Sequence, residues 1–223
     1  MSALNLVLLG PPGSGKGTQG ERLQADLELP YYATGNILRE AVREQTNLGK
    51  EAKSFMDRGD LVPDDVIVGV IADRLASHEA EDGFILDGFP RTVGQADALS
   101  ARMKELGKRL TAAILIDVTD EEVVRRLGGR RTCPNGHVFH AEFDPPQVEG
   151  VCDVCGEALI VRDDDEPDVI QHRLVQYKEK TAPLVDFYDQ AGVLERIAGN
   201  KPPDDVYEEV RGLLATLRME EEA

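Results

Sequence analysis

The chain has 223 residues, of which 41% are hydrophobic, and this suits one globular α/β domain with small insertions. No apolar run approaches the roughly 20 residues of a membrane span, and the N-terminus lacks the basic segment of a signal peptide, so we expect a cytoplasmic protein without a membrane partner. The 42 acidic residues outnumber the 25 basic ones, and the net charge of -17 repels nucleic-acid backbones, which argues against a nucleic-acid partner. In so acidic a chain, a local group of arginines is informative.

Short apolar runs of strand length recur along the chain. The predicted strands are 4–9, 83–87, 112–117 and 193–197. Each is followed by a segment with helical periodicity. This alternation predicts an α/β fold in which helices cover both faces of a parallel sheet.

Capping residues mark most of the predicted helices. The helices span 15–27, 92–106, 120–127 and 204–218, and two more begin at Asn36, as N-cap, and at Asp168. We also expect a helix that ends near Gly59, a following helix capped by Asp64, and a break at Pro183.

Residues 10–18, GPPGSGKGT, lie between the first predicted strand and the first predicted helix. This is the context of a phosphate-binding loop, in which glycines let backbone N–H groups approach the phosphates and Lys16 reaches the β- and γ-phosphates. The alternative is a Gly/Pro turn with a chance lysine, but spacing and flanks both fit the loop. The predicted ligands of the triphosphate are Gly13, Ser14, Gly15, Lys16, Gly17 and Thr18.

The hydroxyl residue of this loop is displaced by one position. Most such loops place Ser or Thr directly after the lysine, whereas Gly17 intervenes here and Thr18 supplies the hydroxyl. The string resembles the loop of nucleoside-monophosphate kinases, and the motifs described next extend the resemblance to adenylate kinases over nearly the whole chain. The resemblance implies a P-loop NTPase-like sheet, ATP and AMP as substrates, ADP as product, Mg²⁺ with ATP, and a monomer.

A second nucleotide site is expected after residue 31. Residues 32–39 resemble the AMP-side segment of adenylate kinases, in which Thr34 and Arg39 contact the nucleotide, and Leu61-Val62 resembles the segment whose backbone meets adenine. Alone, the segment also reads as an amphipathic helix with a solvated arginine. Asn36 stands where the family usually has an acid.

Residues 87–92, DGFPRT, are more specific, because a carboxylate at the end of a buried strand lies where α/β sheets bind ligands. We expect Asp87 to organise Mg²⁺ through water, Gly88 to allow close approach, and Arg91 to hold the AMP phosphate. Gln95, one turn later, can read an adenine edge. By resemblance the Phe89-Pro90 bond is cis. The alternative is a strand-to-helix turn with a surface arginine.

Four arginines lie within residues 125–131, directly before a cysteine-rich insert. A solvated charge run is the ordinary explanation of such a cluster. The cluster resembles the family's entry to a lid over ATP. By that resemblance, the catalytic residues are Lys16, Asp87, Arg91, Arg126, Arg130, Arg162 and Arg173. Arg126 and Arg130 then contact ATP, Arg162 and Arg173 contact AMP, and Asp164 and Asp165 pair within the closed lid.

All three cysteines, Cys133, Cys152 and Cys155, lie in this insert, a pattern that indicates a metal site before a disulfide. Zinc-type lids of the family commonly use four cysteines, and here one is missing. A structural Zn²⁺ needs four ligands, so we predict His137 as the fourth, with His140 as the rival. A metal-free lid held by hydrogen bonds is the alternative.

The predicted organisation is a core of residues 1–32, 63–128 and 166–223, an AMP-binding segment of 33–62, and a zinc-ribbon-like lid of 129–165. Two other functions fit the sequence less well. UMP or CMP kinases usually have shorter lids, and a zinc-knuckle module for nucleic acid does not explain the acidity or residues 87–92.

Overall fold

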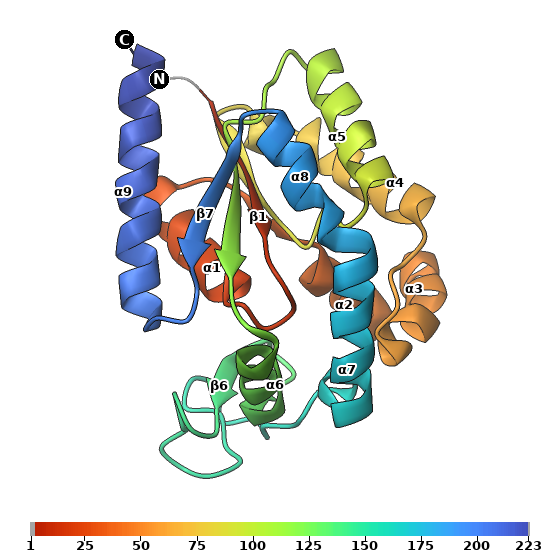
Figure 1. Ribbon diagram of the computed structural model, residues 1–223. Helices are drawn as coiled ribbons and strands as arrows, with labels where there is room; N and C mark the ends of the chain where they lie inside the picture. Colours follow the sequence, from red (N-terminus) through yellow and green to blue (C-terminus); the bar gives the residue numbers. More distant parts are fainter. Residues whose placement is uncertain (1–2, 223) are drawn as a thin grey trace.

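The computed structural model describes residues 3–222 and has a five-stranded parallel sheet at its centre (Figure 1). The strand order is β2-β3-β1-β4-β7, and the bounds are β1 Leu4–Leu9, β2 Tyr31–Ala33, β3 Gly83–Asp87, β4 Ala112–Asp117 and β7 Leu194–Ala198. Every neighbouring pair is parallel, so the carboxyl ends of all five strands lie at one edge. Ligands of open α/β sheets bind at that edge.

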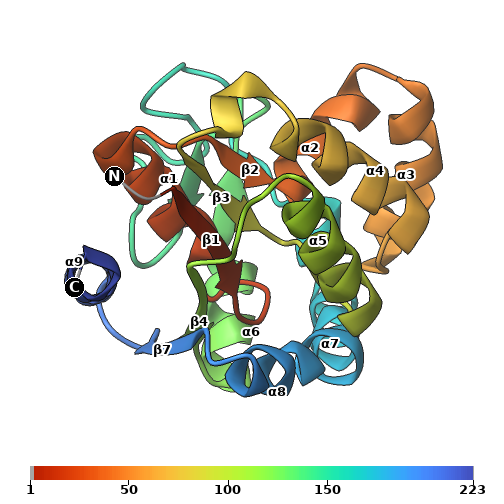
Figure 2. The same cartoon turned by 90° about the horizontal axis from the view of Figure 1, so that it is seen from above.

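Helices cover both faces of the sheet, as Figure 2 shows from above. One face packs on α1 (Lys16–Leu27) and α9 (Pro203–Glu222), and the other packs mainly on α4 (Asp64–Leu75), α5 (Val93–Glu105) and α8 (Pro183–Gln190). The reason is that successive side chains of a strand point to opposite faces of the sheet. In β1, Leu6 and Leu8 contribute to the first core and Val7 and Leu9 to the second.

The remaining helices lie around the carboxyl edge of the sheet. They are α2 (Thr34–Arg43), α3 (Asn47–Arg58), α6 (Asp120–Gly129) and α7 (Pro167–Gln176). Helices α6 and α7 pack on each other through a small core that includes Leu127 and Ile170. Between them the chain forms a protruding insert with one antiparallel pair, β5 (Arg130–Thr132) and β6 (Val138–His140). The strand arrows in Figure 1 point toward this insert.

The predicted α/β sheet with helices on both faces is confirmed, and most predicted elements are present, with some differences. The short strands β2, β5 and β6 were not predicted. The predicted break at Pro183 is present, because this residue begins α8 after a π-helical segment, Tyr177–Thr181. Asn36 is not the N-cap of α2, because that helix begins two residues earlier at Thr34. Asp64 is the first residue of α4 rather than its N-cap. Its carboxylate instead accepts hydrogen bonds from Gln95 of α5 and from Thr92, the N-cap of α5. Among the described helices, none is long and apolar enough to cross a bilayer.

Candidate active site

The phosphate loop joins β1 to α1 and depends on glycine. Gly10, Gly13 and Gly15 have φ of 140°, 74° and 100°, a region that other residues rarely adopt. A Cβ at Gly10 would lie 2.4 Å from the carbonyl oxygen of Ile116. Helix α1 begins at Lys16, so the N–H groups of its first turn face the loop. Gly17 and Thr18 belong to that turn, and Thr18 is exposed.

Lys16 folds back over this loop. Its Nζ donates to the carbonyl oxygens of Gly10 and Pro11, each at 2.8 Å, and to Ser14 Oγ at 3.3 Å. Burial lowers the pKa of Lys16 to about 8, Asp87 opposes the shift, and nearby arginines add to it. The ammonium therefore lies in a site that is short of anions, and the phosphates of a nucleotide would supply them.

A second pocket lies between α2, α3, the start of α5, and α7. It is lined by eight of the nine residues predicted for AMP, namely Thr34, Arg39, Leu61, Val62, Gly88, Arg91, Gln95 and Arg173. Arg162, the ninth, lies outside the pocket lining and donates from Nε to Thr132 Oγ1 at 3.0 Å.

The turn after β3 organises this pocket. Gly88 has φ of 75°, and its carbonyl oxygen accepts from Thr34 Oγ1 at 2.9 Å and from Arg91 Nε at 2.8 Å. A Cβ at Gly88 would lie 2.7 Å from Thr34 Oγ1, so only glycine fits. The Phe89-Pro90 bond is cis, as the resemblance implied. Burial, and next Arg173, lower the pKa of Arg91, and Asp87 opposes the shift.

Asp87 ends β3 between the loop and the second pocket. Its Oδ2 accepts a hydrogen bond of 2.7 Å from the hydroxyl of Tyr31, and burial followed by Asp87 raises the pKa of that hydroxyl. Tyr31 was not predicted as a site residue. Its only signal was its position directly after Pro30, at the start of an unrecognised strand.

Arg130 and Arg173 converge on two acids at the exit of the insert. Arg130 Nε and Nη2 bind Asp165 at 2.7 and 2.6 Å, a bidentate pair in which the side chain of Asp165 is 0% exposed. Arg173 Nη1 donates to the Asp164 carbonyl oxygen at 2.7 Å and lies 3.2 Å from Asp165 Oδ1. The entry and the exit of the insert are thus tied together.

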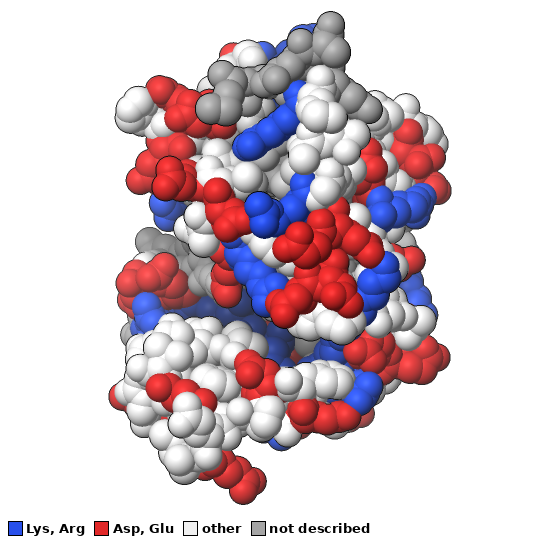
Figure 3. Space-filling model, turned by 90° about the vertical axis from the view of Figure 1, so that its left-hand side faces the viewer, with Lys and Arg blue, Asp and Glu red and all other residues white. Residues whose placement is uncertain are grey.

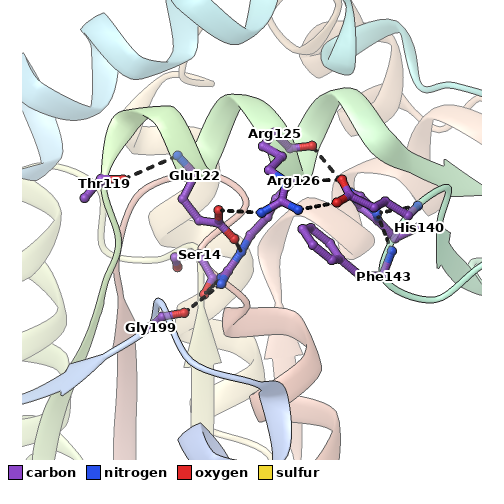
Figure 4. A network of polar contacts seen from close by, with 9 residues as sticks. Ser14, Thr119, Glu122, Arg125, Arg126, His140, Phe143 and Gly199 are labelled. Carbon is purple, nitrogen blue, oxygen red and sulfur yellow. Dashed lines mark hydrogen bonds and ion pairs between the residues drawn. The ribbon is translucent and has the colours of Figure 1, made fainter.

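Two adjacent arginines of α6 contact different parts of the molecule, Arg126 the core and Arg125 the insert (Figure 4). Arg126 donates to the carbonyl oxygens of Ser14 at 3.2 Å and Gly199 at 2.7 Å, both in the core. Arg125 instead pairs with Glu142 and lies 4.4 Å from the ring centroid of Phe143, both in the insert. Helix α6 therefore connects the phosphate loop to the insert.

Positive charge is concentrated where these elements meet. Six cations interact electrostatically here with four carboxylates, which leaves a local charge of about +2 in a chain of net charge -17. The cations are Lys16, Arg39, Arg91, Arg130, Arg162 and Arg173, and the acids are Glu21, Asp87, Asp164 and Asp165. Figure 3 shows Lys and Arg side chains gathered in the recess between the insert and the rest of the molecule.

The insert brings three cysteines and one histidine together. The ligand atoms of Cys133, His137, Cys152 and Cys155 all lie within 4.8 Å of one another. His137 Nδ1 lies 3.2 Å from Cys133 Sγ and 3.4 Å from Cys152 Sγ, and the Sγ atoms of Cys133 and Cys155 are 3.7 Å apart. Zn–S bonds of ~2.3 Å in a tetrahedron place two sulfurs about 3.8 Å apart, so these residues fit Zn²⁺.

His140 lies outside this group. Its Nδ1 accepts from the backbone N–H of Glu142 at 3.1 Å and of Phe143 at 3.0 Å, and its ring stacks on Phe143 with centroids 4.3 Å apart. Its Nε2 lies 3.4 Å from the Arg125 carbonyl oxygen. His140 thus belongs to the contact between the insert and α6.

A phosphate loop and a second arginine-lined pocket share one cationic centre, an arrangement that suits phosphoryl transfer between two bound phosphate esters. Fold and site together define the class of nucleoside-monophosphate kinases.

Comparison with known proteins gives the family. The model of the adenylate kinase family matches residues 8–193. An adenylate kinase of Methanococcoides burtonii is 50% identical over 207 residues, which are 93% of this chain and 96% of the relative. Adenylate kinases of Staphylococcus aureus and Agathobacter rectalis are 47% and 44% identical, each over 212 residues, 95% of this chain and 99% of the relative. The chain belongs to the adenylate kinase family.

Proposed function

We propose that this chain transfers the terminal phosphoryl group of ATP directly and reversibly to AMP, with ATP on the phosphate loop and AMP in the arginine-lined pocket. Family membership supports the reaction, ATP + AMP giving two ADP. The observation that carries the assignment of pockets is that Lys16 of the loop and Arg91 of the pocket belong to one cationic cluster. The phosphates of both nucleotides then meet at this cluster.

The protein's part in the reaction is positioning and charge. Phosphoryl transfer spreads negative charge over the equatorial oxygens of the moving group, and fixed cations stabilise that charge. We assign this role to Lys16, Arg91, Arg126, Arg130, Arg162 and Arg173, while Thr34, Arg39, Leu61, Val62, Gly88 and Gln95 hold AMP. The phosphate of AMP is itself the nucleophile and is already ionised, so no general base is assigned.

Asp87 and Thr18 are proposed to hold the Mg²⁺ that accompanies ATP. A carboxylate, a hydroxyl and phosphate oxygens are the hard donors that this ion prefers, with water completing its shell. When bound, Mg²⁺ neutralises phosphate charge. The hydrogen bond from Tyr31 occupies Oδ2 of Asp87 and so fixes the orientation of the carboxylate.

Two segments, 33–62 and 129–165, are proposed to close over AMP and ATP respectively and to exclude water, the competing acceptor. Two contacts support closure. Arg43 of the first segment lies 3.5 Å from the Pro134 carbonyl oxygen of the second, and Asp60 accepts from His172 of α7 at 2.7 Å. Arginines from both segments then surround the phosphates together.

Zinc is proposed as a structural ion of the lid, held by Cys133, His137, Cys152 and Cys155. All four ligand positions are supplied by the protein, so the ion has no open site for chemistry. Free thiols gathered at a metal site, rather than disulfides, also fit the proposed cytoplasmic location. A monomer is proposed from the family resemblance.

A coupled assay of ADP formation tests the function. With ATP fixed, AMP is compared with UMP and CMP as acceptors, and ATP is then compared with GTP as donor. Transfer to AMP well above the other acceptors is expected. Faster transfer to UMP or CMP, or nucleic-acid binding without transfer, would replace the proposal with one of the two alternatives.

A further inference from the structure

The side chain of Gln95 is held by two partners of opposite kind. Its Oε1 accepts from the backbone N–H of Arg91 at 2.7 Å, and its Nε2 donates to Asp64 Oδ1 at 2.6 Å. Asp64 Oδ2 in turn accepts from Thr92 Oγ1 at 2.9 Å. Gln95 is only 2% exposed and lines the second pocket, whereas Asp64 does not line it and lies exposed at the start of α4.

These two partners fix the orientation of the Gln95 side-chain amide. A backbone N–H only donates, and an ionised carboxylate only accepts. If the amide of Gln95 rotated by half a turn, its NH₂ group would face the N–H of Arg91 and its oxygen would face the carboxylate of Asp64. Both contacts would become repulsive, so one orientation is selected.

The geometry points to Asp64 as a positioning residue that sets the base specificity of the acceptor pocket. Gln95 retains one lone pair on Oε1 and one N–H on Nε2 for a ligand. In this fixed order the amide matches adenine, whose N6 donates and whose N1 accepts. It opposes hypoxanthine, which has the same shape but carries an accepting O6 and a donating N1–H. This inference rests on the proposed function, in which Gln95 reads the acceptor base.

The ordinary role of Asp64 would be to stabilise the N-terminus of α4 by its charge. Asp65 shares that turn, is exposed as well, and supplies a matched control. In Asp64→Asn the new amide can present either a donor or an acceptor to Gln95, so only Arg91 continues to oppose rotation. In Asp65→Asn the same charge is lost while Gln95 remains fixed.

The test measures kcat and KM with AMP and with IMP as acceptors, at saturating MgATP. For Asp64→Asn we expect kcat/KM for AMP to fall about tenfold, mainly through KM, because one hydrogen bond to a charged group no longer holds the amide. We expect kcat/KM for IMP to stay constant or rise, so that the AMP/IMP ratio falls at least tenfold. The KM for MgATP should not change, Asp64→Glu should restore part of the ratio, and Asp65→Asn should match the wild type.

Thermal unfolding and AMP binding by calorimetry accompany the kinetics, so that a fold defect is recognised. A parallel loss with AMP and IMP, or an equal effect of Asp65→Asn, would overturn the inference and leave Asp64 as a helix-terminus charge. Gln95→Ala separates this failure from that of the proposed function. An unchanged AMP/IMP ratio in Gln95→Ala would mean that this pocket does not read the acceptor base, whereas a ratio lost in Gln95→Ala but kept in Asp64→Asn would refute only the role of Asp64.

Discussion

Binding of MgATP should change the protonation of Lys16, because the free protein holds this ammonium in a site that disfavours its charge. Burial lowers its pKa to about 8, and triphosphate oxygens in contact with Nζ should return it toward its ordinary value. Above pH 8 the free protein has largely lost this proton, and the complex regains it, so binding must take up a proton from solution.

The size of this uptake follows from the pKa. With a pKa of about 8 in the free protein and full protonation in the complex, uptake is about 0.1 proton at pH 7, about 0.5 at pH 8 and about 0.9 at pH 9. A linked effect has the same origin. Between about pH 8 and the unfolded value near 10.5, the unfolded chain binds more protons at Lys16 than the folded one, so the contribution of Lys16 to the free energy of unfolding rises with pH.

Isothermal titration calorimetry measures this uptake. MgATP is titrated without AMP in buffers of different ionisation enthalpy, and the slope of the observed enthalpy against the ionisation enthalpy is the number of protons exchanged. Lys16→Met should abolish the rise with pH, while substitution of the exposed Lys180 by Met should preserve it. Uptake that stays near zero from pH 7 to pH 9, or proton release, would refute the reasoning about Lys16.

Three further predictions follow from the site. Arg91→Ala should lower kcat for ADP formation about 100-fold or more while leaving the melting temperature within a few degrees, since burial and Arg173 already disfavour its charge; near-normal turnover would remove Arg91 from the site. Asp165→Asn should lower the free energy of unfolding in urea by about 3 kcal/mol, because Arg130 and Arg173 lose a buried partner. As a control, substitution of the exposed Asp163 by Asn should change this free energy by less than ~0.5 kcal/mol. Equal effects of the two substitutions would contradict the stabilising role of the buried Asp165. Cys152→Ser, or removal of zinc by a chelator, should speed hydrogen exchange in residues 130–160 far more than in the sheet, since structural zinc contributes on the order of 10 kcal/mol to the folding of small zinc-binding units. Uniform acceleration in the insert and the sheet would argue against a separately stabilised lid.

The sequence was sufficient for features that depend on local pattern. Val7 and Leu9 alternate with Leu6 and Leu8, and the apolar run predicted β1 at its observed bounds. The run at 112–117 did the same for β4. Strand β2 escaped prediction because three residues, Tyr31–Ala33, are too few for a pattern, and pairing with β3 makes them a strand.

Features that depend on tertiary contacts were not predictable. Asp64 suggested a helix cap, but its carboxylate accepts hydrogen bonds from Thr92 and Gln95, about 30 positions away. Arg39 and Arg91 were predicted as site residues from the family resemblance of their motifs. The hydrogen bond between Tyr31 and Asp87 joins residues 56 positions apart, and no local signal indicates it.

The most direct test is a crystal structure with a bisubstrate ligand in which two adenosines are joined through five phosphates. We predict that one end of the phosphate chain lies on residues 10–18 and the other end lies against Arg39 and Arg91. The middle phosphates should lie among Lys16 and the lid residues Arg130 and Arg162. A ligand bound at only one pocket, or a phosphate chain that avoids these side chains, would contradict the account.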